Sequence, residues 1–410
     1  MAAKIMTLLL CVFLFVNCSG SQPEPINPVA PLDPELIYIV EYWDVEPPSA
    51  MDPQGLYRPG VERLAKEFCG ANPGIDVRIR WLKWAEAEDE LTRALRDGNP
   101  PDIFADWQGI ARRDHVLQIP ADTWLKAELL TEAGKRLAAH EGRIWAWPRW
   151  LWPTGLLTLG SGLDLSAEEL AQLVSSSWDW QQLGQRLQSQ GLHLEANDWE
   201  GEFTSQAMLA STGCGWGRWG GQELHQVLAG LEILAQEGLA SGGGEYLKIT
   251  EGAVVIGGAA SAFMTWLAEE IPDDEVVLLP LPSVGPSRYL PITGVSLVQF
   301  RQLRYKGDEH ARAAALAAEF LAREQGAQLA QQLRAASAWN EPQQEWAALP
   351  PWHGLLLREA TEQGVPCRAV DMAGRRREQE LRGQAALLLA DFWAGRITAQ
   401  ELARGIEDLQ

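Results

Sequence analysis

Two pairs of neighbouring aromatic and acidic residues are the positions in this sequence best suited to ligand chemistry. Trp43 and Asp44 follow the apolar run of residues 36–40, and Asp106 and Trp107 follow the short apolar segment 102–105. An indole offers a flat apolar face that stacks on a ring, and a carboxylate accepts hydrogen bonds from hydroxyl groups. The pairs therefore indicate a site for a ligand such as a sugar, unless each aspartate caps a helix or turn beside a packed indole.

A second candidate is the segment of residues 143–155, which holds four tryptophans and two prolines. Pro148 and Pro153 forbid a regular helix through it, and its alternation favours two short extended pieces. Indoles dominate protein cores, so core packing is one interpretation. The other is that some of them floor a binding cleft between two lobes.

Motifs for other kinds of chemistry are absent or weak. The sequence has no Walker phosphate loop, His-Glu-x-x-His or Gly-x-Ser-x-Gly, and its six histidines are scattered singly. Residues 215–220 formally match Gly-x-Gly-x-x-Gly, but the segment before them reads as a helix, and their tryptophans would crowd a pyrophosphate. We therefore expect neither a cofactor nor a metal.

The elements that position the two aromatic and acidic pairs alternate between strands and helices. Apolar spacing predicts strands at residues 36–40, 75–81 and 102–105, with helices at 61–68 and 86–96 between them. This order is typical of a parallel α/β sheet, in which ligands meet the carboxyl ends of the strands. The first strand is expected to be buried on both faces.

Helices dominate after residue 155. Ser166 and Glu169 form a capping box at the start of one predicted helix, and residues 180–190 and 222–236 carry helical spacing.

Length and composition limit the class of protein. A chain of 410 residues exceeds what one core usually serves, so we expect two domains. The net charge of -21 disfavours nucleic acid or an acidic membrane face as a partner, because both would be repelled at long range. The 19 tryptophans exceed the six tyrosines and nine phenylalanines, which suits either ring stacking or packing.

The N-terminus is typical of an exported protein. Lys4 precedes the apolar run 5–16, which is too short to span a bilayer but fits a signal peptide over residues 1–17. The next residues resemble a bacterial lipobox, in which Cys18 would be lipidated, although Phe15 and Asn17 differ from the usual small residues. Five prolines between residues 19 and 34 predict an extended tether that does not pack.

The order of features along the chain resembles the extracellular solute-binding proteins of ABC transporters, in particular the sugar-binding, maltose-binding-protein-like lipoproteins of family 1. The resemblance runs from Glu35 to Gln410. It rests on the segments 72–77, 98–104, 146–148, 221–240, 251–266, 279–282, 293–296, 310–333 and 392–402.

The resemblance implies a type II periplasmic-binding-protein-like α/β fold, with two lobes joined by a hinge and a ligand cleft between them. It divides the chain into a signal peptide (1–17), the lipidated Cys18 with its proline-rich tether (18–34), lobe one (35–150 plus 267–323) and lobe two (151–266 plus 324–410). Carried over by position, the ligand-binding residues are Trp43, Asp44, Trp84, Asp106, Trp107, Trp150, Trp152, Phe203 and Trp266, with Trp199 as a further candidate.

The function implied is that of a monomeric binding protein without chemistry of its own. It would be anchored to a membrane in the periplasm or at the cell surface, capture a small ligand, first of all a mono- or oligosaccharide, and deliver it to ABC permease subunits. Within the Trp-rich segment, Trp145 and Trp147 are expected in the core of lobe one. Trp150 and Trp152 are expected at the hinge, where a change to Ala should weaken ligand binding more than folding.

Two alternatives stay open at this point. A surface glycan hydrolase also has a Trp-lined cleft with carboxylates, and Asp44 and Asp106 would be its pair. A sensor or scaffold lipoprotein could share the binding fold without taking part in import.

Overall fold

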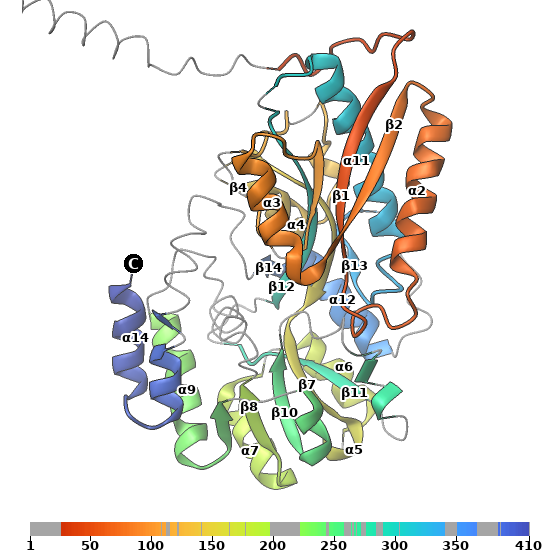
Figure 1. Ribbon diagram of the computed structural model, residues 1–410. Coiled ribbons are helices and arrows are strands. Elements are labelled where there is room, and N and C mark those ends of the chain that lie inside the picture. Colours follow the sequence, from red (N-terminus) through yellow and green to blue (C-terminus); the bar gives the residue numbers. More distant parts are fainter. Residues whose placement is uncertain are drawn as a thin grey trace, which may run out of the picture.

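The computed structural model describes residues 26–409 except for 108, 112–114, 121–122, 141, 164, 177, 197–221, 243–245, 258–263, 265, 268, 272–275, 284–289, 303, 341–350, 367–383 and 386. The described residues form two lobes, one above the other in Figure 1. Lobe one is built on a seven-stranded sheet and lobe two on a five-stranded sheet. Each lobe has its own cluster of buried apolar side chains. The predicted two-lobe α/β architecture is confirmed.

The first elements of lobe one follow the sequence pattern closely. Strand β1 (Tyr38–Glu46) lies between β2 (Ile75–Lys83) and β3 (Ile103–Asp106) and pairs in parallel with both. Helices α2 (Tyr57–Ala71) and α3 (Ala87–Arg96) connect them. The expectation that the first strand is buried on both faces is wrong at its start, where Ile39 is 39% exposed.

The Trp-rich segment forms one strand, β6 (Trp147–Pro153), rather than two pieces. It pairs antiparallel with β12 (Leu290–Gln299) and, on its other side, with β13 (Ala336–Ser337). The register with β12 shifts between Val295 and Ser296, so Arg149 is the extra residue of a β-bulge. A bulge tolerates Pro148 inside the strand and turns Arg149 toward the core.

Other elements complete lobe one. The long helix α11 (Asp308–Gln328) packs beside α2 and behind β6, and its alanines are almost all buried. The smaller elements are η1 (Trp84–Glu86), η2 (Ala127–Leu129), α4 (Glu132–Ala138), the pair β4 (Ala139–His140) and β5 (Arg143–Ile144), and β14 (Gly364–Pro366) beside β12.

Lobe two has the strand order β11-β7-β10-β8-β9. Its strands are β7 (Gly155–Leu159), β8 (His193–Ala196), β9 (Ala240–Gly242), β10 (Ala253–Gly257) and β11 (Val276–Pro280). Its helices are α5 (Gly160–Leu163), α6 (Ala167–Ser175), α7 (Trp180–Gln190), α9 (Gln222–Gln236), η3 (Tyr246–Glu251) and α14 (Ala399–Asp408), and α12 (Pro351–Gln363) packs against α6 of lobe two and α4 of lobe one. The predicted helices 180–190 and 222–236 and the Ser166–Glu169 capping box are confirmed.

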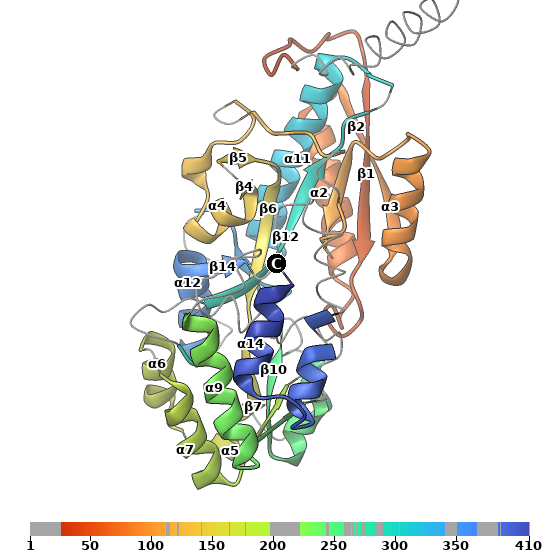
Figure 2. The ribbon, with the colours of Figure 1, turned by 90° about the vertical axis from the view of Figure 1, so that its left-hand side faces the viewer.

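The chain crosses directly between the lobes where β6 leads into β7, with Thr154 between the two strands, and Figure 2 shows this continuous path. It returns between β11 and β12. The pairing of β11 with β7 puts residues 276–280 in lobe two, although we expected 267–323 in lobe one. The continuous helix α11 and the residues up to Trp339 pack in the core of lobe one, beyond the expected boundary at 323.

The proline-rich segment packs from Ile26 onward, contrary to the expectation for residues 26–34. The Trp124 indole donates a hydrogen bond to the Pro28 carbonyl (2.8 Å), and Ala30 is 4% exposed. Prolines do not prevent packing here because Trp124 and Arg312 donate hydrogen bonds to carbonyls of the segment, which also forms a turn from Asn27 to Ala30. Within the described residues, no helix is both long and apolar enough to cross a bilayer.

Candidate functional site

Asp44 lies at the centre of a closed hydrogen-bond network inside lobe one. Its carboxylate accepts hydrogen bonds from the hydroxyls of Tyr42 and Tyr57 (2.6 Å for Tyr57), from Trp107 Nε1 (3.0 Å) and from the backbone amide of the next residue (2.7 Å). Arg149 Nη1 lies 3.3 Å from the same carboxylate. Asp44 has no exposed surface, so its acceptor capacity serves the protein interior.

Arg149 supplies the positive charge of this network and is also fully buried. Its Nη1 donates to Gln325 Oε1 (2.7 Å) and to the Tyr57 hydroxyl (2.6 Å), and its guanidinium lies 4.3 Å from the centre of the Trp150 ring. Burial lowers the pKa of Arg149, but the neighbouring Tyr57 and Asp44 outweigh burial and raise it. Its Nε and Nη2 have no hydrogen-bond partner among the described residues. The site therefore holds a permanent cation in a largely aromatic shell.

The two tyrosines remain hydroxyl donors at any physiological pH. Burial raises the pKa of both phenols well above the usual value. For Tyr42 the next cause is the negative charge of Asp44, and for both tyrosines the charge of Arg149 opposes the shift. The Tyr57 hydroxyl can thus donate to Asp44 while it accepts from Arg149.

The indoles of lobe one form a contiguous group around this ion pair. The ring of Trp107 meets the rings of Trp150 and Trp84 edge to face, with distances of 5.5 Å and 6.0 Å between ring centres. Its centre lies 5.9 Å from that of Trp152. Trp150 is 0% and Trp152 1% exposed, and Trp152 Nε1 donates to the Leu333 carbonyl (2.8 Å). Both indoles therefore lie in the core of lobe one and not on a surface that a ligand could touch.

The outer members of this group keep some contact with solvent. Trp84 is half-buried, Trp107 is 4% exposed and Asp106 is 8% exposed. Asp106 Oδ1 accepts a hydrogen bond from the Ile110 amide (2.6 Å), which makes it a turn carboxylate, the alternative considered from the sequence. Trp43 is 7% exposed on the opposite side of β1 from Asp44, with the Arg80 guanidinium 4.3 Å from its ring centre.

Three solved structures share this architecture over almost their full length, whereas no family model and no curated protein matches the sequence. A cyclic α-maltosyl-1,6-maltose-binding protein from Arthrobacter globiformis has a TM-score of 0.68 at 13% identity, with 91% of this chain and 98% of that chain covered. A family 1 extracellular solute-binding protein from Bifidobacterium longum subsp. infantis has a TM-score of 0.65 at 16% identity, with 91% and 99% covered. The ABC substrate-binding protein from Listeria monocytogenes in complex with cycloalternan has a TM-score of 0.61 at 12% identity, with 90% and 97% covered.

The chain has the fold of the family 1 extracellular solute-binding proteins. In this solute-binding fold, the sequence-predicted residues Asp44, Trp84, Trp107, Trp150 and Trp152 come together in one part of lobe one. Trp266 is half-buried against the core of lobe two. Trp199, Phe203 and Cys18 lie outside the described residues.

Sequence reasoning missed the polar partners of Asp44. Tyr42 could have been found, because residues two apart point to the same side of a strand. Arg149 also left a signal, since a lone charge within a strand of tryptophans and prolines needs a buried partner. Tyr57 begins the helix that follows β1, and Gln325 comes from a helix far along the chain; no local pattern marks either of them.

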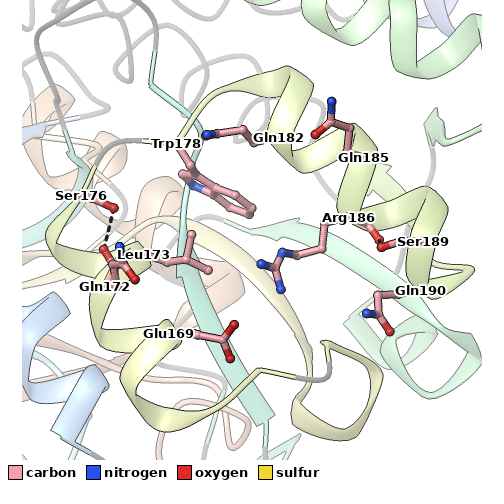
Figure 3. Close-up of a pocket in the computed structure, with 10 residues that line it drawn as sticks. All are labelled: Glu169, Gln172, Leu173, Ser176, Trp178, Gln182, Gln185, Arg186, Ser189 and Gln190. Atoms are coloured by element: carbon pink, nitrogen blue, oxygen red, sulfur yellow. Dashed lines mark hydrogen bonds between the residues drawn. The ribbon is translucent and has the colours of Figure 1, made fainter.

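A separate pocket of about 650 Å³ lies between α6 and α7 on the solute-binding fold's second lobe, and Figure 3 shows its side chains. Much of its polar lining is committed to local structure. Glu169 and Gln182 complete helix capping boxes, and the hydroxyls of Ser176 and Ser189 donate to carbonyls of their own helices. Among the described residues, no group of His, Cys, Asp and Glu is arranged to hold a metal ion.

Proposed function

We propose that this chain is an exported lipoprotein that captures a small neutral carbohydrate between its two lobes and delivers it to an ABC importer. The observation that carries the proposal is the fold, which matches that of solute-binding proteins over about nine-tenths of this chain. One of those proteins is named for its binding of cyclic α-maltosyl-1,6-maltose, and another was solved in complex with cycloalternan.

The ligand contacts that we propose are Trp84, Asp106 and Trp107, the members of the predicted set that stand at the ends of β2 and β3. Trp84 is half-buried, and Trp107 and Asp106 keep 4% and 8% exposure; together they would offer a stacking surface and an acceptor at the carboxyl ends of β2 and β3, where α/β sheets bind ligands. Trp266 would contribute from lobe two. Trp199 and Phe203 stay predicted contacts on the strength of the sequence.

The buried members support these contacts instead of touching the ligand. Asp44, Trp150 and Trp152 have at most 1% exposure and hold the inner side of Trp107. Trp43 packs under Arg80 on the other side of β1. Capture would then proceed by hinge closure, with the ligand shifting the population from open to closed forms.

Glycan hydrolysis does not suit this arrangement. Such enzymes need two carboxyl groups that face the scissile bond from either side. Asp44 is enclosed and saturated by donors, and Asp106 is bonded to backbone amides of its own turn. Neither carboxyl of the candidate pair is free to act on a glycosidic oxygen.

The membrane anchor belongs to the same proposal. Lipidation of Cys18 would leave residues 19–25 as the spacer before the packed segment begins at Ile26. Seven residues span at most about 25 Å when fully extended. The anchor would therefore hold lobe one close to the membrane surface.

A thermal-shift screen against neutral mono- and oligosaccharides tests the proposal. A ligand at one hundred times its Kd stabilises the folded protein by about 2.7 kcal/mol, so the cognate sugar should raise the Tm by several degrees. Trp84→Ala should weaken that shift, since an aromatic stacking contact contributes roughly 0.5–1.5 kcal/mol beyond its buried area. The matched control is Trp393→Ala, which removes a half-buried indole in lobe two.

Absence of stabilisation by every saccharide would contradict the carbohydrate assignment. Equal loss of the ligand shift in both variants would contradict the proposed contact set.

A further inference from the structure

The packed N-terminal segment determines where an anchored chain would leave lobe one. Arg312 Nη1, in the second turn of α11, donates a hydrogen bond to the Ala30 carbonyl (2.5 Å), and Trp124 Nε1 donates to the Pro28 carbonyl (2.8 Å). Ile26 packs against the core of lobe one. Residues 26–32 therefore form a strap held beside the N-terminal end of α11, at the top of lobe one in Figures 1 and 2.

The loop of residues 301–307, which leads into α11, has an unusual charge for this protein. Three of its seven residues are basic and none is acidic, whereas the whole chain has 55 acidic and 34 basic residues. Arg301 and Arg304 are exposed, and Tyr305 is 59% exposed. Lys306 is exposed as well, but its Nζ lies 3.1 Å from Asp102, so its charge is already compensated.

We propose that this loop, called here the basic loop, is a membrane-facing surface that contacts anionic lipid headgroups while the strap holds it near the anchor. The net negative charge of the protein does not prevent this contact. The Debye length is about 8 Å at physiological ionic strength, so acidic groups elsewhere on the molecule are screened at the membrane surface. Each exposed cation near an anionic leaflet strengthens binding about five-fold, and tyrosine suits the interface because its ring is apolar and its hydroxyl is polar.

The strap and the basic loop act together in this proposal. The two arginines alone are too few for stable membrane binding, which takes a polybasic cluster or a second signal. The strap lies beside the N-terminal end of α11, and the basic loop leads into that same end. An anchor attached upstream of Ile26 therefore raises the local concentration of lipid headgroups at the basic loop.

The inference rests on the proposed anchoring at Cys18, so the test supplies an anchor of its own. The mature chain, with a hexahistidine tag in place of residues 1–18, is captured on vesicles that contain a nickel-chelating lipid. The vesicles are otherwise phosphatidylcholine alone or phosphatidylcholine with 30% phosphatidylglycerol. Hydrogen–deuterium exchange of the peptide that covers residues 301–312 is then compared between the two kinds of vesicle.

We expect exchange in this peptide to slow at least five-fold on the anionic vesicles and not on the neutral ones. Arg301→Glu with Arg304→Glu should abolish the difference. Arg63→Glu is the control for a charge reversal elsewhere on lobe one, because Arg63 bonds Gln328 at the opposite end of α11, and it should keep the difference. Arg312→Gln with Trp124→Phe loosens the strap and should reduce the protection while the protein stays on the vesicles.

Equal exchange on both vesicles, or equal loss in the Arg63 control, would overturn the proposal. Melting curves in solution show whether each variant is folded before the vesicles are added. Mass spectrometry of protein isolated from cells tests the anchor itself, and a Cys18 without lipid would refute the proposed lipidation. The vesicle experiment does not depend on that result, because the tag replaces the acyl chain.

Discussion

Replacement of Arg149 by methionine is the sharpest test of how lobe one holds its aromatic group together. Methionine keeps most of the apolar volume but removes the guanidinium that lies 3.3 Å from Asp44 and 4.3 Å from the centre of the Trp150 ring. Asp44 would remain buried as an anion that is neutralised only by hydroxyl and N–H donors. Gln325 would lose its only described donor to Oε1.

The expected cost is large because the pair has no exposed surface. Removal of one partner from a buried ion pair destabilises a protein by about 3–5 kcal/mol. For a lobe of this size, each kcal/mol lowers the Tm by roughly 2–4 °C, so the expected decrease is about 6–20 °C. Asp44→Asn should cost a similar amount, since it leaves the guanidinium without a counter-charge.

Urea unfolding followed by circular dichroism measures these free energies. The double variant should lose less than the sum of the single variants by about 1–3 kcal/mol, because it leaves no unpaired charge. Arg58→Met is the control, since Arg58 forms an exposed pair with Glu46 that should contribute about 0–1 kcal/mol. If Arg149→Met unfolds within about 0.5 kcal/mol of the wild type, the ion pair does not organise the lobe as argued.

Two further predictions concern lobe packing away from this pair. Burial lowers the pKa of His353 to about 3, so its imidazole stays neutral in the folded protein, whereas the unfolded chain binds a proton below about pH 6.5. Acidification from pH 7 to pH 5 should therefore lower the free energy of unfolding in urea by about 2 kcal/mol. His353→Gln should make the free energy of unfolding less dependent on pH over this range. Gly155→Ala would place a Cβ 2.2 Å from the Leu279 carbonyl oxygen at the start of β7 and should destabilise lobe two by about 1–3 kcal/mol, whereas Gly162→Ala, with 3.5 Å to its nearest neighbour, should melt like the wild type in the same experiment.

The elements that the sequence predicted well are those with local signals. The β1–α2–β2 unit has apolar residues at strand and helix spacing, and its parallel pairing follows from that order. The capping box of Ser166 and Glu169 is visible as two residues three positions apart. In each case the residues that determine the structure are neighbours in the chain.

The expectations that failed or shifted depend on contacts between distant segments. The apolar sequence of β11 would suit a strand in either sheet, and only its pairing with β7 puts it in lobe two. The burial of Trp152 depends on β13 and on the turn that carries Leu333, both far along the chain. Asp44 looked like a ligand acceptor because its partners Tyr57 and Arg149 come from other elements.

The buried ion pair also gives a reason for the many indoles of lobe one. A site that stacks on a neutral ligand gains affinity when its rings are already fixed, because less side-chain freedom is lost on binding. Trp107 is fixed from one side by its hydrogen bond to Asp44 and from the other by edge contacts with Trp150 and Trp84. A salt link inside an aromatic shell is not screened by solvent, so this order persists at high ionic strength. The rigidity of the proposed stacking surface therefore originates in part in Asp44, Arg149 and Trp150, which a ligand would not touch.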